Sequence, residues 1–397
     1  MEVLVVYKED YPWDVRVEKL AQTLKSAGHS VTVIARNRDQ LPTIDENNGI
    51  AIRRLPKTHR LPKFVQAAVN LPVWFNPFWL WLLLRSSRNI KKNEGVIIVR
   101  DLPLVKTGIL VAKIRKLKII FDMAECYPEM YESAAQFSNR SLTTKILKNP
   151  KIARNYEQKV IAKVDHILVM IQESKDRLIA MGVNTDKISI VSNTPPNDKF
   201  KGATHQHQGT QLRIVYVGFL SKLRGLDLLI EGAAQYIKNQ GAADAIRIDI
   251  IGKGAQKERL IALSNELGIS ESVKVHGWLD HDEVEKLMAS ANIGALTYRV
   301  CGHWNHTIPN KIFDYMLAGL PVLATEVIPI ARILNETHSG VVCKDLDPTD
   351  ISEKMVLLRD PERRGVLGEN GRSAIESKYN WENDARMLNE TIENIYK

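Results

Sequence analysis

A helix start that carries a cation and a carboxylate is expected near residue 310. Proline favours the first helical position, so Pro309 is predicted to open a helix whose apolar residues recur at helical spacing as far as Leu317. The unpaired N–H groups of a helix start attract phosphate, and Lys311 adds a full positive charge. Asp314 follows one turn later, although an acid at this place can also serve only to balance the helix dipole. The segment is therefore predicted to hold a phosphate beside a hydrogen-bonding carboxylate.

The order of residues in this segment resembles glycosyltransferase family 4. In that family two acidic residues are separated by seven others and are followed by a run similar to Met-Ala-x-Gly-x-Pro-Val. In this register Asp314 takes the second acidic position, which in the family holds the nucleotide ribose. His306 replaces the first, a glutamate that touches the donor sugar, and we expect a hydrogen bond from this histidine to a sugar instead. The residues that carry the resemblance are Asn310-Lys311, Asp314-Tyr315-Met316, Ala318-Gly319 and Pro321-Val322.

The resemblance extends over nearly the whole chain and is strongest from Val215 to Thr325. It implies an α/β protein of the GT-B fold, with two Rossmann-like domains facing a cleft. It also implies a retaining transferase that binds a nucleoside-diphosphate sugar on the second domain and an acceptor on the first. In the family the donor phosphate is expected to help deprotonate the acceptor during front-face attack, which requires no protein nucleophile.

Length and the alternation of predicted strands and helices favour two domains. A chain of 397 residues is too long for one ordinary core, and its 44% hydrophobic and 25% charged residues are typical of a soluble globular protein. We predict an acceptor-side domain over residues 1–198, a polar linker over 199–211 and a nucleotide-sugar-binding domain over 212–379, with a final helix at about 380–397 that crosses back. Strands are predicted at 2–7, 31–35, 50–55, 96–99, 118–121, 166–170, 188–191, 212–217, 246–251, 273–276 and 321–324.

Cysteine usage and the amino terminus indicate a cytoplasmic protein. Cys126, Cys301 and Cys343 show no close pairing and no CxxC, so neither a disulfide framework nor a structural zinc site is suggested. The first residues are apolar for only a short stretch and then become acidic, which is typical of a first strand rather than of a signal peptide.

Glycine-containing loops are expected at the carboxyl ends of the strands in the second domain, where open parallel sheets bind ligands. In the first of these loops Arg224-Gly225 resembles the Lys-Gly pair of the family, whose cation meets the donor diphosphate, and Lys222 is expected to assist. Glycines at the later strand ends are expected to leave room for a flat base and its ribose. The predicted donor-binding residues are Gly218, Lys222, Arg224, Gly225, Gly252, Gly254, Gly277, Trp278, Pro309, Asn310 and Lys311.

Charged side chains also follow the predicted strands of the first domain. Asp101 follows one strand, and Asp122 and Glu125 follow the next, at the edge of the sheet that would face a ligand. The resembling family often has Asp-x-His-Glu in this last loop, whereas Ala124 replaces the histidine here. Capping of the strand ends is the alternative interpretation of these acids. The predicted catalytic residues are His306, Asp314, Asp122 and Glu125, and the acceptor-side candidates are Arg16 and Asp101.

No metal and no other cofactor is predicted. The cations of the donor loops and the helix start at Pro309 would meet the charge of the leaving group, so that none is required. Cys301, His303 and His306 are closely spaced, but a closed zinc site takes four ligands and no fourth is in view. The loop after the first strand contains no glycine, so the sequence gives poor support for NAD binding.

Positive charge is concentrated in the first domain. Residues Arg53 to Ile120 contain fifteen Lys or Arg and two acids, a balance of +13 in a chain whose net charge is +9, yet no nucleic-acid-binding motif accompanies them. Within this region Phe64 to Leu84 is rich in Trp and Leu, but its unbroken apolar run is much shorter than the about 20 residues that a spanning helix needs. Aromatic residues flanked by lysines are typical of a segment that lies on an anionic membrane. Packing of the aromatic residues inside the domain is the alternative.

Three functions remain open. A retaining transferase would take a nucleotide-sugar donor and a saccharide or lipid-linked acceptor at the inner face of the plasma membrane. A GT-B-fold sugar-nucleotide epimerase would need no acceptor. A nucleotide-sugar-binding protein without catalysis would explain the departures at His306 and Ala124. None of the three implies a nucleic-acid partner.

Overall fold

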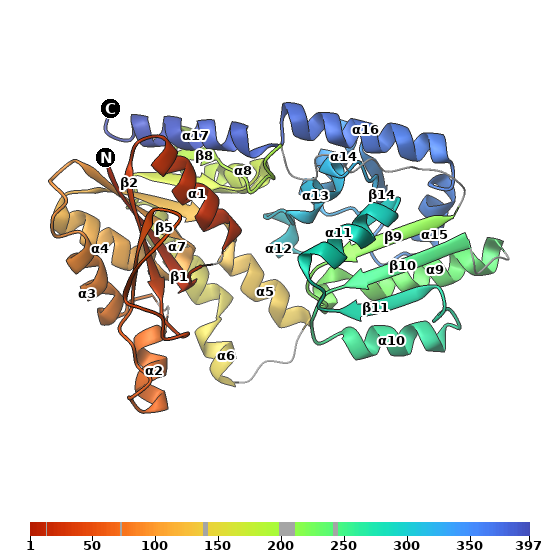
Figure 1. The fold of residues 1–397 in the computed structure, drawn as a ribbon, viewed down its shortest axis with the longest axis horizontal. Helices are drawn as coiled ribbons and strands as arrows, with labels where there is room; N and C mark the ends of the chain where they lie inside the picture. Colours follow the sequence, from red (N-terminus) through yellow and green to blue (C-terminus); the bar gives the residue numbers. More distant parts are fainter. Residues whose placement is uncertain (13, 72–73, 138–141, 198–210, 241–244) are drawn as a thin grey trace. The chain divides into compact units, whose positions relative to one another are not determined.

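The computed structural model describes residues 1–12, 14–71, 74–137, 142–197, 211–240 and 245–397. The predicted linker, except Gln211, lies outside the described residues. The chain divides into two compact units (Figure 1). Unit 1 comprises Met1–Tyr131, Ser141–Asn193 and Asp384–Lys397, and unit 2 comprises Glu132–Arg140 and Thr194–Asn383.

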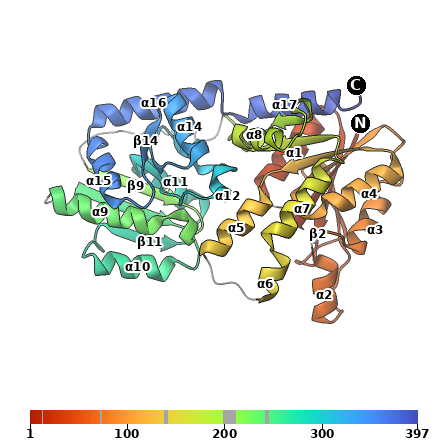
Figure 2. The same ribbon diagram turned by 180° about the vertical axis from the view of Figure 1, so that it is seen from behind.

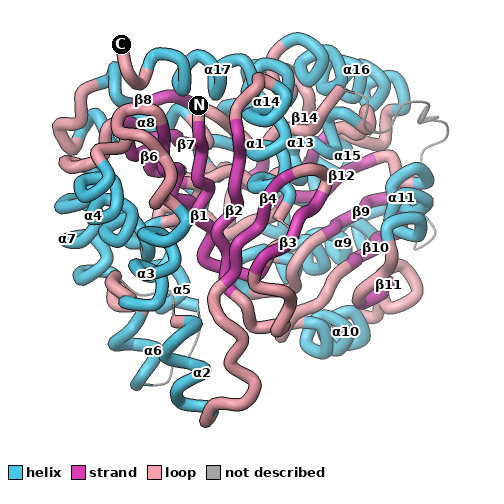
Figure 3. Tube along the Cα trace, turned by 60° about the vertical axis from the view of Figure 1, so that its left-hand side comes forward, coloured by secondary structure: helices cyan, strands magenta, loops and turns pink. Residues whose placement is uncertain are grey.

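Unit 1 is built on a sheet that has eight strands among its described residues, in the order β3-β4-β2-β1-β5-β6-β7-β8. Every neighbouring pair is parallel except β3 and β4, and Figure 3 shows β1 to β4 side by side. Strand order runs outward in one direction from β1 and in the other from β5, so the topological switch point lies between these two strands. The strands are β1 Glu2–Asp10, β2 Ser30–Arg36, β3 Ile44–Asn47, β4 Ile50–Arg54, β5 Gly95–Arg100, β6 Lys118–Met123, β7 His166–Val169 and β8 Ile188–Ile190.

Helices cover both faces of this sheet. α1 packs against β1, β2 and β4, whereas α3, α4 and α7 lie together on the other face (Figure 2). Asp14 starts α1 by accepting hydrogen bonds from the N–H groups of Arg16 and Val17. The helices that lie wholly or partly in unit 1 are α1 Val15–Ser26, α2 Lys63–Asn70, α3 Pro77–Ser86, η1 Leu102–Leu104, α4 Val105–Arg115, α5 Tyr127–Phe137, α6 Leu142–Leu147, α7 Pro150–Ile161, α8 Gln172–Ala180, η2 Thr185–Lys187 and α17 Trp381–Asn394.

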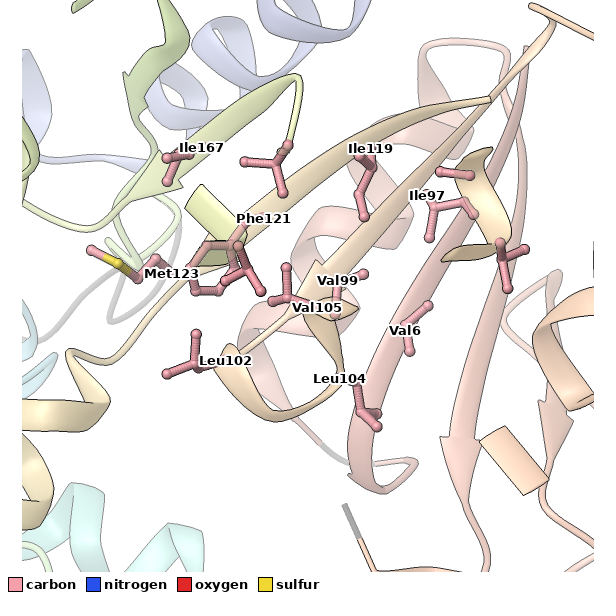
Figure 4. Packing of buried hydrophobic residues seen from close by; sticks show 14 of the residues in the cluster. Val6, Ile97, Val99, Leu102, Leu104, Val105, Ile119, Phe121, Met123 and Ile167 are labelled. Atoms are coloured by element: carbon pink, nitrogen blue, oxygen red, sulfur yellow. The ribbon is translucent and has the colours of Figure 1, made fainter. Parts of the chain in front are cut away.

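The core of unit 1 lies between the sheet and the helices α3, α4 and α7. Alternate residues of neighbouring strands, among them Val6, Val99 and Phe121, point into it (Figure 4). Trp79 of α3 is fully buried in the same cluster. Each such side chain contributes about 1.5–3 kcal/mol by leaving water, and together they fix the strand ends that position the polar residues described below.

The final helix is part of unit 1 from Asp384 onward. In α17 the hydroxyl of Thr391 donates to Ser189 Oγ at 2.9 Å. The hydroxyl of Tyr396, just after the helix, donates to the carbonyl oxygen of Gly95 at 2.6 Å. These bonds anchor the carboxyl-terminal segment to β8 and β5.

Unit 2 has a six-stranded sheet among its described residues, in the order β11-β10-β9-β12-β13-β14 with all neighbours parallel. Its switch point lies between β9 and β12. α9 packs with α15, and α13, α14 and α16 form a second group (Figure 1). The elements are β9 Leu212–Val217, η3 Lys222–Arg224, α9 Leu226–Gln240, β10 Ile246–Ile251, α10 Lys257–Glu266, β11 Val273–Gly277, α11 His281–Ser290, β12 Ile293–Leu296, α12 Gly302–Asn305, α13 Lys311–Leu317, β13 Val322–Thr325, α14 Ile328–Thr337, β14 Gly340–Cys343, α15 Pro348–Leu357 and α16 Pro361–Ser377.

The predicted fold class is confirmed, since both units are doubly wound α/β sheets of the Rossmann-like kind. One helix start was predicted wrongly. α13 begins at Lys311, so Pro309 lies two residues before its first helical residue. The N–H groups of Ile312 and Phe313 bond to the carbonyls of Pro309 and Asn310, three residues back. This turn is tighter than an α-helical one and delays the helix.

Candidate functional site

The loops that follow β9 and β12 meet at the switch point of unit 2. Gly225 has φ +59°, and a Cβ on it would lie 1.9 Å from the carbonyl oxygen of Thr297. The N–H of Arg299 donates to the carbonyl of Leu223 at 3.1 Å, and the indole N–H of Trp304 donates to the same oxygen at 3.2 Å. A glycine at position 225 therefore lets the two loops pack backbone to backbone, which places the η3 side chains over the β12 loop.

Arg224 is held between two aromatic rings of the β12 loop. Its guanidinium carbon lies 4.5 Å from the ring centre of Tyr298 and 4.4 Å from that of Trp304. Stacking of this kind uses the flat faces of the guanidinium group and leaves its edge N–H groups for a ligand. The Nε atom is buried and has no hydrogen-bond partner among the described residues. Lys222, two residues earlier, is exposed.

Asp314 and Lys311 form an ion pair on one face of α13. Lys311 Nζ lies 2.9 Å from Asp314 Oδ2, and the aspartate is only 6% exposed while the lysine keeps contact with solvent. The carboxylate and the cation that were predicted to meet different parts of a nucleotide therefore neutralise each other here. A ligand that offered both a hydroxyl pair and a phosphate would satisfy the two groups separately.

Tyr315 fixes α13 against the sheet. Its hydroxyl accepts a hydrogen bond of 3.0 Å from the N–H of Val217, the last residue of β9. Its ring fills the space beside Gly294 of β12, where a Cβ would lie 2.4 Å from the ring. Complete burial raises the pKa of Tyr315, so the hydroxyl stays protonated. Tyr315 thereby ties α13 to β9 and β12, the two strands that flank the switch point.

The two histidines of this region differ in their surroundings. Nδ1 of His306 lies 2.9 Å from the carbonyl oxygen of Gly302, and because a carbonyl only accepts, this nitrogen donates. In the neutral ring Nε2 is then the acceptor. His303 is buried, and burial together with the charge of Arg224 lowers its pKa to about 4, so it is neutral near pH 7. Across the described residues no group of three or more His, Cys, Asp or Glu is placed to hold a metal.

Gly252 and Gly254 let the loop after β10 cross the loop after β9. A Cβ on Gly252 would lie 1.8 Å from the carbonyl oxygen of Gly218, and one on Gly254 would lie 2.2 Å from that of Leu220. The N–H of Leu220 donates to the carbonyl of Lys253 at 3.0 Å. The space on the Cβ side of these two glycines is therefore filled by backbone.

Trp278 presents an aromatic face at the end of β11. It is 73% exposed, and Nζ of Lys253 lies 4.9 Å from its ring centre. Gly277 before it has φ +86° and turns the chain out of the sheet. An exposed ring with a cation beside it is suited to stack on the base of a nucleotide.

In unit 1 the predicted residues Arg16 and Asp122 form a buried ion pair. Nε of Arg16 donates to Asp122 Oδ2 at 3.0 Å, and Nη1 donates to the carbonyl of Ser192 at 2.7 Å. Both residues are almost completely removed from solvent. The pair ties α1 to the end of β6 and to the chain after β8. Neither side chain can reach a ligand unless this pair first breaks.

Asp101 occupies an unusual place at the end of β5. Its backbone has φ 70° and ψ 154°, a region that is essentially restricted to glycine. The carboxyl group is 5% exposed and lies 3.7 Å from Lys8 Nζ, and burial raises its pKa. Glu125, the other acid predicted here, is half-buried after β6.

Tyr298, Trp304 and Tyr315 were not predicted to belong to the site. The stack on Arg224 joins residues about 80 positions apart, and the bond from Val217 to Tyr315 spans 98. Local spacing carries no signal of such pairs. The only hint was the presence of aromatic residues inside the segment that also carries His306 and Asp314.

Two sequence models of known families match the chain. The model described as Glycosyltransferase Family 4 matches residues 14–194, and the model described as Glycosyl transferases group 1 matches residues 198–374. A D-inositol 3-phosphate glycosyltransferase of Corynebacterium jeikeium is 25% identical over 278 residues, which cover 66% of this chain and 65% of that protein. An uncharacterized glycosyltransferase of Methanocaldococcus jannaschii is 25% identical over 96% of this chain and 93% of its own length. The chain spans 54–65% of the length of three of the curated relatives that it matches.

Solved structures share the fold. Sucrose-phosphate synthase of Thermosynechococcus elongatus matches with a TM-score of 0.76 at 15% identity and covers 100% of this chain and 99% of its own. HepE of Anabaena, solved in complex with UDP, matches with a TM-score of 0.71 at 13% identity over 99% of this chain and 100% of its own. The chain thus has the GT-B fold, which is built from two Rossmann-like units. Because the two family models together match nearly the entire sequence, the chain belongs to glycosyltransferase family 4.

Proposed function

We propose that the protein is a retaining glycosyltransferase that moves a sugar from a nucleoside-diphosphate sugar to a saccharide or lipid-linked acceptor. The observation that carries the proposal is the arrangement at the switch point of unit 2. There Arg224 is clamped between Tyr298 and Trp304, and the tyrosine that follows Asp314 anchors α13 to the same strand ends. The UDP complex of HepE supports this class of donor.

Each group has a part in the proposed reaction. The guanidinium group of Arg224 receives the diphosphate, and Trp278 stacks on the base. Asp314 exchanges Lys311 for the ribose hydroxyls, which frees the ammonium group to meet a phosphate. Nε2 of His306 accepts a hydrogen bond from a hydroxyl of the donor sugar.

The chemical step exchanges one bond at the anomeric carbon of the sugar for another. The bond from this carbon to the diphosphate oxygen breaks with its electron pair going to the diphosphate. The acceptor oxygen forms the new bond on the same face, and its proton passes to the leaving phosphate. Cations aimed at the developing negative charge lower the barrier, and we propose that no metal is required.

A product assay with labelled donors tests this proposal. The protein is incubated with a panel of radiolabelled UDP and GDP sugars and a lipid extract, with and without EDTA. We expect label in the saccharide or lipid fraction, an unchanged anomeric configuration by NMR, and activity that survives EDTA. An altered free nucleotide sugar would show an epimerase, and donor binding without turnover would show a binding protein. An absolute need for a divalent cation would contradict the metal-free step.

We further propose that unit 1 rests on the cytoplasmic face of an anionic membrane. The Trp- and Leu-rich segment divides in the structure: Trp79 is buried, whereas Phe64 of α2 is 75% exposed and Trp81 of α3 is 47% exposed. The exposed aromatic residues share their helices with exposed basic ones, including Lys63 and Arg85. In the described part of the chain, no helix combines the length and apolar character needed to span a bilayer.

Flotation with vesicles tests this surface. Basic residues near an anionic leaflet contribute about 1 kcal/mol each. We therefore expect the Lys91→Glu, Lys92→Glu double variant to release the protein from phosphatidylserine-containing vesicles. The Lys151→Glu, Lys159→Glu double variant changes two exposed lysines of α7 in the same unit and serves as the control. Equal flotation of the two variants, or no flotation of the wild type at low salt, would contradict the proposal.

A further inference from the structure

Trp304, which stacks on Arg224, belongs to a very short helix. α12 comprises only Gly302–Asn305, and the N–H groups of a first helical turn have no carbonyl partner within their helix. The residue before α12 is Cys301, and among the described residues its side chain caps no N–H group of the helix. Ser, Thr, Asn and Asp are the usual capping residues. α12 therefore needs a hydrogen-bond acceptor from another part of the fold to hold its first turn.

Ser133 of α5 supplies this acceptor. Its Oγ accepts a hydrogen bond of 3.1 Å from the N–H of His303, the second residue of α12. Both residues are buried, with exposed fractions of 2% and 7%, so water cannot replace this bond unless the contact opens. α5 begins in unit 1, but its residues from Glu132 onward belong to unit 2, as does α12. The cap thus comes from a helix 170 residues earlier in the chain.

Three contacts connect the capped turn to the guanidinium group of Arg224. The ring centres of His303 and Trp304 lie 4.3 Å apart. The ring centre of Trp304 lies 4.4 Å from the guanidinium carbon of Arg224. The indole N–H of Trp304 donates to the carbonyl of Leu223, the residue before the arginine, at 3.2 Å. Displacing the first turn of α12 would therefore move one face of the stack that holds Arg224.

We propose that Ser133 is a positioning residue for the nucleotide donor, because its cap on α12 holds Trp304 against Arg224; this inference rests on the proposed function. Ser133 acts through the stack and not by contact with the donor. A stacked guanidinium group presents its N–H groups to a diphosphate in a fixed direction. Loosening the tryptophan side of the stack keeps the charge of Arg224 but allows its guanidinium group several orientations. Donor affinity then falls, because binding must restore the single orientation.

A titration with UDP tests the role of the Ser133 hydroxyl. Ser133→Ala removes the acceptor, and alanine is a strong helix former that preserves α5. We expect the UDP affinity to fall about threefold to tenfold, the effect of losing one buried capping bond. Ser133→Thr keeps the hydroxyl and should recover most of this affinity. Ser264→Ala is the matched control, since it removes another buried hydroxyl of unit 2 that bonds to a backbone carbonyl, and it should leave the affinity unchanged. Equal affinities in Ser133→Ala and Ser264→Ala would overturn the inference.

A double-mutant cycle separates positioning from a general loss of stability. The Arg224→Lys background has no planar group to orient. In this background Ser133→Ala should therefore change the UDP affinity by less than about twofold. The same loss of affinity in both backgrounds would overturn the inference, because Ser133 would then act independently of the stack.

A measurement without ligand distinguishes failure of this inference from failure of the proposed function. The indole N–H resonance of Trp304, assigned by NMR with Trp304→Phe, reports on the bond to Leu223. This resonance should shift in Ser133→Ala and stay in place in Ser264→Ala. An unchanged resonance in Ser133→Ala would overturn the inference. If the wild type binds neither UDP nor GDP, the proposed donor class is contradicted, and the indole resonance alone decides whether Ser133 holds the stack.

Discussion

The switch points of the two sheets have the same topology, but different kinds of residue lie at their strand ends. In unit 2 the strand ends carry glycines that bring loops together and a guanidinium group stacked on aromatic rings. In unit 1 the corresponding edge borders a cavity lined by aromatic side chains, among them Trp74, Tyr127 and Tyr131, and by the charged residues Lys8, Glu9 and Lys148. A doubly wound sheet therefore offers a place for a ligand, and the residues at the strand ends decide which ligand it takes.

Buried charge is also used differently in the two units. Arg16 is saturated by Asp122 and by the carbonyl of Ser192, so it acts within the fold. Arg224 is held by the faces of two rings, and its Nε has no partner among the described residues. The hydrogen-bonding groups of Arg16 are thus occupied within the fold, whereas Arg224 is partly exposed and keeps an N–H group without a partner among the described residues. The following experiments test this contrast.

The largest effect on stability is expected for the buried ion pair between Arg16 and Asp122 in unit 1. Asp122→Ala leaves the guanidinium group of Arg16 buried without its carboxylate, which should lower the free energy of unfolding by about 3–5 kcal/mol. Urea unfolding followed by fluorescence measures this change. The Arg16→Met, Asp122→Leu double variant should lose much less, because it removes both charges together. A single variant as stable as the wild type would show that the pair does not support the fold.

Asp314→Ala should lower kcat/KM by about 100-fold, or about 2.7 kcal/mol in transition-state stabilisation, since the ribose would lose its carboxylate partner. Stability should change little, because the partner Lys311 keeps contact with solvent. Asp314→Asn should recover part of the activity. Glu353→Ala, at an exposed acid of α15, is the control and should match the wild type. Unchanged kinetics in a folded Asp314→Ala protein would remove this residue from the site.

Arg224→Lys should weaken UDP binding about tenfold to a hundredfold, because a lysine keeps the charge but loses the planar stack and the paired N–H groups. Lys222→Ala should cost less than about 1 kcal/mol, since this side chain is exposed. Isothermal titration with UDP compares the two. Equal losses of UDP affinity in the two variants would show that the stacking of Arg224 between the aromatic rings does not contribute to UDP binding.

The smallest effect is a shift in proton binding. Burial lowers the pKa of both His303 and His166 to about 4, with Arg224 contributing only to the first. Arg224→Gln should raise the pKa of His303 modestly and leave that of His166 unchanged in the same NMR titration. Both folded pKa values lie below the unfolded value of about 6.5. The stability from these histidines is therefore fully present above pH 6.5 and is lost as the pH falls toward 4.

The His303→Gln variant tests the predicted direction of this pH dependence of stability. Its stability should fall less steeply between pH 6.5 and 4 than that of the wild type, because the unfolded chain no longer gains a proton at this position. The change is followed by thermal unfolding across this range. Curves that remain parallel would show that His303 does not contribute.

Four of the six strands described in unit 2 were predicted, because buried parallel strands are continuous apolar runs, whereas Ile293–Leu296 and Gly340–Cys343 were missed. Leu212–Val217 and Ile246–Ile251 have the predicted bounds. Ile44–Asn47 was missed, since a strand that reads Ile-Asp-Glu-Asn has no period to detect. It forms only because it pairs antiparallel with Ile50–Arg54. For Ile44–Asn47 the partner strand supplies the stability, so the residue pattern alone does not predict the strand.

The sequence by itself determined the family, the two α/β arrays and the type of residue at each strand end, because these depend on local periodicity and on the order of short motifs. Only the tertiary structure decided which charged side chains are paired within the fold and which remain available to bind a ligand. It placed Arg16 against Asp122 across 106 residues and Arg224 against Trp304 across 80. Whether an arginine is satisfied or left to a ligand depends on which side chains the fold brings within about 3–5 Å of it, and contacts between distant residues leave no periodic trace in a single sequence.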